Sequence, residues 1–560
     1  MPKLRWLYLL LLAVLWACSA DSPPSPTAGT LPSVTTSSST TVPTTPPTSA
    51  AEAEASTLRV GSVVPVSNLD PADAYTFPEW ELLHAISEGL LVLEPGSGDV
   101  APGLAEGPPE IDSSRHTYTF GLRPEIQFAD GTMLTAPMYA DAIRRVMDLG
   151  GQGSGLVTSF VADVEAPDDD TVVFSLTGDY AFFPTVVAGA PYLPVHPDAF
   201  PSDRLEPLPE PPIYGVGPWF IDRQSPAEVV LERSDHYQGS PVAIERIVVR
   251  YFDSVDEMAA EMAEGELDVI WRGVGAEMAA ALAGEDAIRF EEVPGGALQF
   301  LVVNHGLPPT DDPRVRQAIA RLTDRGSIAE KALGGAVESA FSAIPPGLLA
   351  SNESFREMYG EEPDVEAAVE LLTEAGYSQA APAQVELAYP PERYGVELAG
   401  AIEDLERQLE ASGLIEVTLT AQPWNTYVGD VVDGTYHLAF LEWLYDFPDP
   451  HNYLAPFILD GGLGGSGVTL ENDHPEMVEM FMEAAGEPDE NRRAALYRGV
   501  QALFARDVVT LPLWLDHEYI AYWDHVAGDP ALPYPETLNI GPTMQLDYRS
   551  LRLDPEGLTP

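Results

Sequence analysis

The chain has 560 residues, and its 88 acidic against 28 basic residues give a formal net charge of −60 at pH 7. A field of that sign and size argues against nucleic acid as a partner, because phosphates are repelled. The charge mildly favours cationic solutes, and it equally serves solubility in salty surroundings.

Residues 1–18 have the three-part layout of a bacterial export signal: two basic residues, an apolar run from Trp6 to Trp16, and then Cys18. The run is too short to span a bilayer. Cys18 is the only cysteine, so a disulfide within the chain is impossible. The stretch Leu15–Cys18 resembles a lipobox, which implies a lipoprotein signal peptide over 1–18 with lipidation at Cys18 and anchoring to the outer face of the cell membrane. Trp16 departs from the small residue usual there, and a free cysteine in an ordinary cleaved leader is the alternative.

Residues 19–56 consist almost wholly of Ser, Thr, Pro and Ala, with too little apolar bulk for a core. The composition predicts a tether between membrane and folded protein. About 500 residues follow, enough for two or three domains, and none of their segments is apolar enough to span a membrane. A secreted catalytic domain could carry the same tether, so anchoring does not decide the function.

The segment 58–300 is rich in short alternating runs, such as 117–122 and 171–176, separated by Pro and Gly. Period-two alternation is typical of strands with one buried face. This part of the chain is predicted to form a mixed α+β lobe.

Two aspartates mark helix starts in the second half of the chain. Asp312 precedes Pro313, the N-cap and first-turn pairing of a helix whose buried face would include Val315, Ile319 and Leu322. Asp364 is expected to cap a second helix, which directs Val365, Val369 and Leu372 inward and ends at Gly376.

Residues 385–441 then alternate between strand and helix patterns: strands at 385–389, 415–421 and 436–441, and a helix over 396–409 that stops at Gly413. Strand, helix, strand, short helix, strand implies a parallel α/β sheet. Residues from about 305 to 515 are therefore predicted to form one α/β lobe.

Short motifs occur in a fixed order along nearly all of the mature chain. They are Asn68–Pro71 with Glu88–Leu90, Phe120–Arg123 with Phe128–Gly131, Gly215–Trp219, Leu231–Tyr237, Gly265–Asp268, Asp312–Ala318 with Asp324–Arg325, Leu371–Tyr377, and Trp443–Asp446 with Asp449–Pro450. In this order they resemble the extracytoplasmic solute-binding proteins for oligopeptides, dipeptides and related solutes, the solute-binding family 5 of ABC importers. Coincidence across so many ordered blocks is implausible.

The resemblance implies an α/β fold of two lobes that close on a solute like a clamshell, as in periplasmic binding proteins, with a mixed α+β first lobe that carries an extra domain. The expected division is 57–95, 212–302 and 516–555 for lobe I, 96–211 for the extra domain, and 303–515 for lobe II. Ligand sites favour such lobe interfaces.

One set of candidate ligand-binding residues follows the predicted strand 436–441, where an open α/β sheet places its ligands. The resemblance implies that Asp446 pairs with the α-amino group of a peptide, and that Glu442, Trp443 and Leu444 offer backbone hydrogen bonds to it. The alternatives are a turn or cap role for Asp446 and core packing for Trp443.

Other candidates come from elsewhere in the chain. The resemblance places Tyr75, Thr76 and Phe77 where the first lobe would contact the ligand, with core aromatics as the alternative. Trp424 is a further candidate for the cleft lining, although a buried tryptophan is commonly core.

A secreted hydrolase is the rival class. The sequence contains no G-x-S-x-G, H-E-x-x-H or well-placed S-x-x-K motif, and its histidines lack metal-ligand spacing. We therefore expect no enzyme, no cofactor and no metal. The expected partners are a small solute, with a peptide favoured, and ABC permease subunits, with a monomer as the default state. A sugar, a metal chelate or a receptor in place of the permease are the open alternatives.

Overall fold

The computed structural model describes residues 56–554, apart from 95–96, 115, 273, 276–277, 279–281, 283–286, 395–396, 460–462, 467–473, 529–537 and 539–544. The predicted signal peptide, Cys18 and residues 19–55 of the predicted tether lie outside the described residues. Within the described part, no helix is both long enough and apolar enough to cross a membrane.

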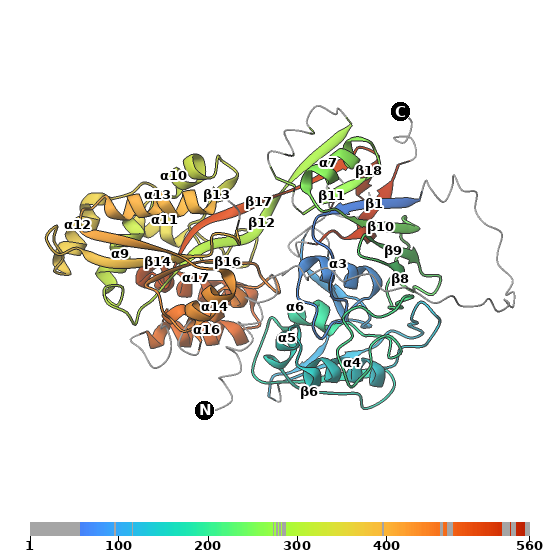
Figure 1. Cartoon of the computed structure of the whole chain (residues 1–560). Coiled ribbons are helices and arrows are strands. Elements are labelled where there is room, and N and C mark those ends of the chain that lie inside the picture. The colour runs from blue at the N-terminus through green and yellow to red at the C-terminus, as the bar shows by residue number, and fades with distance from the viewer. Residues whose placement is uncertain are drawn as a thin grey trace, which may run out of the picture.

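Two long strands, β12 (Ile288–Val303) and β17 (Thr510–Trp523), pair antiparallel and run from one lobe into the other (Figure 1). Their register shifts between Pro294 and Leu298 and again between Gln299 and Phe300. Together they form the centre of one continuous sheet with the order β15-β14-β16-β12-β17-β11-β1-β10-β9-β8, and β13 pairs with β17. We call this strand pair the ribbon.

Lobe I is built on one half of that sheet. Its elements are β1 (Thr57–Ser62), α3 (Phe77–Ile86), β8 (Trp219–Gln224), β9 (Glu228–Arg233), β10 (Arg246–Tyr251), α7 (Val255–Ala263) and β11 (Val269–Trp271), followed near the C-terminus by β18 (Val526–Gly528), η5 (Tyr548–Ser550) and β19 (Leu551–Leu553). Strand β1 is parallel to β10 and β11, whereas β8, β9 and β10 run antiparallel to one another. The predicted mixed α+β character of this lobe is confirmed.

An extra domain lies beside lobe I with a core of its own. Its sheet has the order β4 (Glu110–Asp112), β5 (Thr117–Gly121), β7 (Thr171–Leu176) and β6 (Val161–Glu165), next to a hairpin of β2 (Leu91–Leu93) and β3 (Val100–Pro102). The helices are α4 (Ala136–Leu149), α5 (Ser154–Thr158), α6 (Phe183–Val187) and η1 (Ala190–Tyr192). The predicted strands at 117–122 and 171–176 are confirmed as β5 and β7, because their alternate residues are buried.

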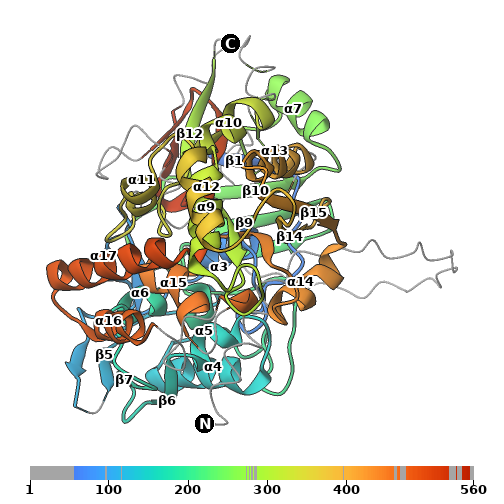
Figure 2. The same cartoon turned by 90° about the vertical axis from the view of Figure 1, so that its left-hand side faces the viewer.

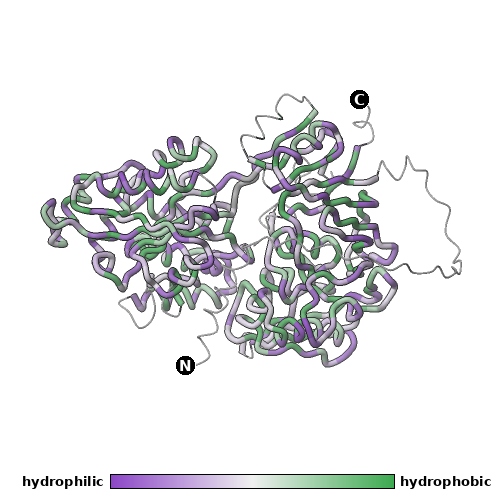
Figure 3. The backbone as a smooth tube through the Cα atoms, viewed as in Figure 1, coloured by the Kyte–Doolittle hydropathy of each residue, from purple (hydrophilic) through white to green (hydrophobic). Residues whose placement is uncertain are grey.

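Lobe II covers the other half of the sheet with helices on both faces (Figure 1 and Figure 2). One face carries α9 (Pro313–Leu322), α10 (Arg325–Ser327), η2 (Ile328–Ala332), α11 (Ser354–Tyr359), α12 (Val365–Glu374) and α13 (Leu398–Glu410); the other carries α14 (Trp424–Val432), α15 (Pro450–Ile458), η3 (Leu463–Gly465), α16 (Pro475–Gly486) and α17 (Glu490–Asp507). The strands are β13 (Val337–Ser339), β14 (Ala383–Tyr389), β15 (Ile415–Ala421) and β16 (Leu438–Trp443). Figure 3 shows apolar residues along the strands in the middle of this lobe, as burial on both faces requires.

The parallel arrangement predicted for this lobe is confirmed for β14, β15 and β16. The sheet as a whole is mixed, because β12 runs antiparallel to β16. The strand predicted at 436–441 lies two residues further on. Its end is extended because Leu298 and Gln299 of β12 pair with Trp443 and Glu442, so these two candidates lie in the strand and not in the loop after it.

Both predicted helix caps are confirmed. The Asp312 carboxylate accepts from the backbone N–H of Arg314 at 2.9 Å, and the Asp364 carboxylate accepts from that of Ala367 at 2.9 Å. The inward position predicted for Val365 is wrong: this residue begins α12 and is 38% exposed, because the first turn of the helix faces solvent.

A buried ion pair fastens the extra domain to lobe I. Arg145 of α4 donates two hydrogen bonds of 2.6 Å to the two carboxylate oxygens of Asp70, which follows β1. The same carboxylate accepts from the backbone N–H groups of Ala72 and Glu206. The side chains of Asp70 and Arg145 are 0% and 3% exposed. Removing one charge would therefore leave the other buried without a partner of opposite charge.

We therefore predict that Asp70→Asn lowers the free energy of unfolding by about 3–5 kcal/mol, since it leaves Arg145 buried without a counter-charge. Chemical denaturation measures the change. The control is Asp141→Asn, which breaks the exposed pair of Asp141 with Arg144 on the same helix and should change stability by about 0.5 kcal/mol or less. Equal effects of the two variants would contradict the assigned role of the buried pair.

Candidate functional site

A hydrogen bond joins the two lobes at the predicted site. The hydroxyl of Tyr75, just before α3 in lobe I, donates to Oδ1 of Asp446, in the loop after β16 in lobe II. Asn452 of α15 donates to the other carboxylate oxygen at 3.0 Å. The structure thus brings together Tyr75 and Asp446, predicted from parts of the chain 371 residues apart.

The loop after β16 is held in place by its own polar residues. Asp449 caps α15, and its carboxylate also binds the guanidinium of Arg493 at 2.5 Å. This fixes the first turn of α15, which contains Asn452. The side-chain oxygen of Asn452 accepts from the indole N–H of Trp443 at 2.9 Å and from the backbone N–H of Asp446 at 3.2 Å. The spacing of Trp443, Asp446, Asp449 and Asn452 along the chain therefore sets the position of the Asp446 carboxylate.

The contacts of Asp446 come from neutral donors. Burial raises the pKa of this carboxyl group above its ordinary value, and the hydrogen bonds from Tyr75 and Asn452 offset that rise only in part. A partly buried carboxylate held by neutral groups gains most from a cationic partner. Asp446 is therefore suited to bind an ammonium group.

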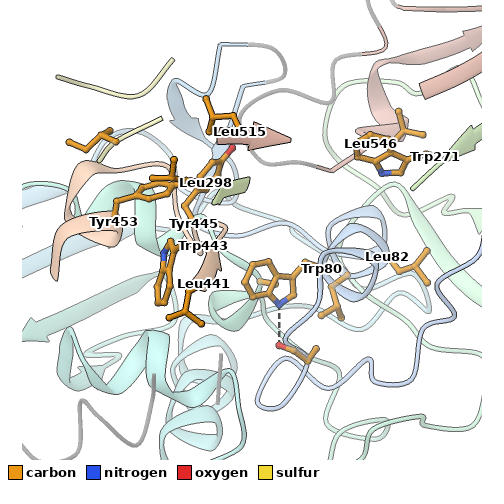
Figure 4. Close-up of a cluster of buried hydrophobic side chains, with 14 of the residues drawn as sticks. Trp80, Leu82, Trp271, Leu298, Leu441, Trp443, Tyr445, Tyr453, Leu515 and Leu546 are labelled. Atoms are coloured by element: carbon orange, nitrogen blue, oxygen red, sulfur yellow. Dashed lines mark hydrogen bonds between the residues drawn. The ribbon is translucent and has the colours of Figure 1, made fainter. Parts of the chain in front are cut away.

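Lobe I presents its part of the site from the start of α3. The carboxylate of Glu79 accepts from the backbone N–H groups of Tyr75 and Thr76 at 3.0 and 3.1 Å, and burial raises its pKa. The rings of Tyr75 and Phe77 pack edge-on against Trp80 at 5.5 and 5.6 Å. The Trp80 indole donates to the carbonyl of Ala74, as Figure 4 shows. Thr76 serves as the helix cap, and Phe77 is half-buried in the core.

Trp443 and Leu444 belong to the hydrophobic core that continues through both lobes (Figure 4). Trp443 is 4% exposed, and its indole N–H donates to Asn452. The side chain of Trp443 therefore packs in the core, which was the alternative to ligand contact. Leu444 is half-buried against the same core.

Glu442 lies on the opposite face of β16 from Trp443, because neighbouring residues of a strand point to opposite faces. Glu442 accepts from the side-chain amide of Gln299 in β12, which also donates to Asp516 in β17. Trp424 begins α14, 5.9 Å from the ring of Tyr394, and the guanidinium of Arg393 lies 4.8 Å from its ring centre.

Sequence reasoning missed Asn452, Gln299 and Asp516. Asn452 directly follows the Asp449–His451 segment, and its proximity to that motif is the signal that could have identified it. Gln299 is a polar residue inside the apolar strand Leu298–Val303, which could have marked it as functional. Asp516 gives no comparable local signal.

The extra domain contacts lobe II next to this site through stacked rings. Phe182 stacks on Phe447 at 5.5 Å and on His451 at 4.5 Å. The backbone N–H of Ala181 donates to the carbonyl of Ala485 at 2.8 Å. Phe447 directly follows Asp446, so the contact also positions the candidate carboxylate.

A cavity of about 260 Å³ lies in lobe II beside the ribbon. Leu298 and Leu515 of the ribbon line it, together with β13 and the loop after it. None of the residues predicted for ligand binding lines this cavity. In the described part of the chain, no cluster of three or more His, Cys, Asp and Glu residues has the arrangement of a metal site.

Two α/β lobes joined by a strand pair, with polar groups from both lobes meeting at their interface, define the class of two-lobed solute-binding proteins. Residues 99–465 match the family described as bacterial extracellular solute-binding proteins, family 5, middle. The chain therefore belongs to the bacterial extracellular solute-binding proteins of family 5, and the predicted family is confirmed.

Relatives match over most of their length. The periplasmic oligopeptide-binding protein OppA of Escherichia coli K12 is 25% identical over 82% of this chain and 87% of its own. The dipeptide-binding protein DppE of Bacillus subtilis is 22% identical over the same shares.

Among solved structures, the unliganded open form of the periplasmic murein tripeptide-binding protein MppA superposes with a TM-score of 0.75 at 19% identity, over 89% of this chain and 97% of its own. Clavulanic acid biosynthesis oligopeptide binding protein 2 gives 0.76 at 24% identity, over 89% and 95%. These likenesses confirm the predicted two-lobed fold.

The raised pKa of Asp446 predicts how the stability of the folded protein changes with pH. An unfolded chain loses this proton near the ordinary value of about 4, whereas the folded protein keeps it to higher pH. The carboxyl group thus favours folding at low pH, and this contribution is lost as pH rises through the raised pKa. Urea unfolding of the ligand-free protein should show Asp446→Asn gaining stability relative to the original chain from about pH 4 upward, until the folded-state pKa is passed. A difference that stays constant with pH, or falls, would show that burial does not dominate at Asp446.

Proposed function

We propose that this protein is the lipid-anchored substrate-binding component of an ABC importer, which captures a peptide or similar small solute outside the cell and delivers it to the permease. The observation that carries the proposal is the Asp446 carboxylate, half-buried at the lobe interface and held by Tyr75 and Asn452. Membership of family 5 and the peptide-binding names of the relatives support it.

A peptide that binds at Asp446 would replace a neutral hydrogen-bond donor with a charged one. In the structure the carboxylate accepts a hydrogen bond from the neutral Tyr75 hydroxyl, across the interface. The α-amino group of a peptide supplies a charged donor, so an ion pair replaces a hydrogen bond from a neutral group. Its charge also stabilises the ionised form of a carboxyl group whose pKa burial has raised.

The position of the peptide backbone follows from the placement of its α-amino group at Asp446. Glu442, Trp443 and Leu444 offer main-chain hydrogen bonds at the end of β16, a form of strand addition. Tyr75, Thr76 and Phe77 contact the solute from lobe I, and Trp424 lines the cleft. Lobe I (57–95, 212–302, 516–555) with the extra domain (96–211) and lobe II (303–515) close around it by bending at the ribbon. We assign the chain no enzymatic activity.

Melting curves of the full chain test the assignment. We expect pooled di- to penta-peptides to stabilise the folded protein by about 2.7 kcal/mol at a hundredfold excess over the dissociation constant. N-acetylated pools should have no effect, because the ammonium group is gone. Asp446→Asn should abolish the response, whereas the control Asp433→Asn, which removes an exposed acid at the end of α14, should keep it.

Two outcomes would count against the assignment. If neither pool shifts the melting temperature, the solute is not a peptide, and sugars and metal chelates would be tested next. Equal shifts with free and acetylated pools would keep peptide binding and reject Asp446 as the partner of the amino group.

The membrane anchor is a separate part of the proposal. Acylation of Cys18, with the leader cut off directly before it, would hold the protein at the outer face of the cell membrane, with 19–56 as the tether and a monomer as the expected state. In a bacterial host, Cys18→Ser should move the protein from the membrane fraction to the medium or periplasm, as immunoblots of the fractions would show. If the variant stays with the membrane like the original chain, Cys18 is not the anchor.

A further inference from the structure

The cavity of about 260 Å³ in lobe II lies where the ribbon enters that lobe. Leu298 of β12 and Leu515 of β17 are opposite each other in the strand register, and Glu338 of β13 is opposite Leu515 on its other side. Residues that are directly opposite each other share a face of the sheet. These three strands therefore form one wall of the cavity, and residues of 339–346 and 351–353 line the rest.

Polar side chains that line the cavity already have partners within lobe II. Ser342 donates to Gln501 at 2.8 Å, and Ser351 donates to a main-chain carbonyl of the same loop at 3.0 Å. Glu353 pairs with Arg356 at 2.5 Å. The apolar part of the lining consists of Ala340, Phe341, Ile344 and two prolines, beside the two ribbon leucines. An apolar group can therefore fill the cavity without taking hydrogen-bond partners away from these polar side chains.

The loop that forms the outer part of the lining is fixed by the rest of lobe II. Besides its bond with the loop serine, Gln501 of α17 donates to the carbonyl of Ala350 at 2.6 Å. The guanidinium groups of Arg356 and Arg325 lie 4.2 and 4.9 Å from the ring centre of Phe341. The cavity is thus formed in the folded protein, and a group that enters it does not have to order the loop.

The cavity is next to the candidate site for the α-amino group. Leu298, which lines the cavity, is opposite Trp443 in the strand register, and Figure 4 shows the two side chains with Tyr445 beside them. The Tyr445 ring lies so close to Gly296 that a Cβ atom there would be 2.8 Å from it. Three residues of chain and one strand spacing put the Cα atoms of Asp446 and Leu298 at most about 16 Å apart.

We propose that this cavity receives one large apolar side chain of a bound peptide, aromatic or branched aliphatic, and so selects peptides that carry such a residue. The inference rests on the proposed function, because it takes Asp446 as the partner of the α-amino group. An extended tetrapeptide spans about 10 Å between its end Cα atoms, and a phenylalanine side chain adds about 5 Å. An apolar cavity of about 150 Å³ can hold benzene, so the volume of about 260 Å³ is sufficient for such a group.

Four tetrapeptides test the inference: tetra-alanine and the three peptides with phenylalanine at position 2, 3 or 4. Dissociation constants are measured for the full chain. We expect one of the phenylalanine peptides to bind about tenfold more tightly than tetra-alanine, or better. Ala340→Leu puts a larger side chain into the cavity lining and should remove most of that preference. The control Ala336→Leu adds the same bulk outside the lining and should keep it.

A second variant and melting curves without peptide separate a filled cavity from a damaged fold. Ser351→Leu adds bulk to another part of the lining and should act like Ala340→Leu. Equal affinity for all four peptides overturns the inference and leaves the proposed function intact. A preference that survives in either variant, with its melting temperature unchanged, does the same.

Crosslinking locates the side chain without any substitution. A tetrapeptide with photo-leucine at the preferred position should attach to residues that line the cavity, as mass spectrometry of the digested protein would show. Attachment only to residues outside the lining overturns the inference, also where both leucine variants misfold.

If none of the tetrapeptides binds, the peptide assignment fails and a second pair of probes decides. N-acetyl-phenylalaninamide and N-acetyl-alaninamide differ only in the side chain, and neither has an α-amino group. A melting shift with the phenylalanine compound alone, absent in Ala340→Leu, supports the apolar site. No shift with it, or equal shifts with both compounds, overturns the inference.

Discussion

The structure depends on the pairing of β12 with β17. These strands are part of the sheet in both lobes, so the position of each lobe relative to the other is set by one antiparallel ladder. The ladder shifts register at Pro294–Leu298 and Gln299–Phe300, where extra residues bend and twist a strand pair. Gln299 and Asp516 lie at or beside this irregularity.

Two kinds of buried acid in this very acidic chain differ in the partners of their carboxylates. Asp268 is buried, which alone would raise its pKa, yet hydrogen bonds from His525 and Arg59 hold that pKa below the ordinary value. Asp446 and Asp516 receive hydrogen bonds only from neutral groups, and burial raises the pKa of both. An acid of the first kind already has basic partners in the folded protein and stabilises it. The second kind would gain from a cationic partner, and the ammonium site proposed at Asp446 is of this kind.

Local features of the fold could be predicted from the sequence, because caps and alternation act over a few residues. Asp312 and Asp364 begin helices as expected. The end of β16 was misplaced, because its length depends on pairing with β12 and not on its own pattern. Tyr75 and Asp446 were connected only through the family resemblance, since nothing local links residues so far apart. The group around Gln299 was missed because it exists only where three strands meet.

The place of β17 along the chain governs when the protein can fold. This strand pairs with β11, β12 and β13 in the middle of the sheet, yet its residues come after all of theirs in the chain. Until they leave the ribosome, β12 keeps one long edge open and neither lobe can complete its core. Contacts of such sequence separation also form slowly. The nascent chain thus stays open until β17 has been made, and its unpaired strand edges are open to non-native pairing during that time.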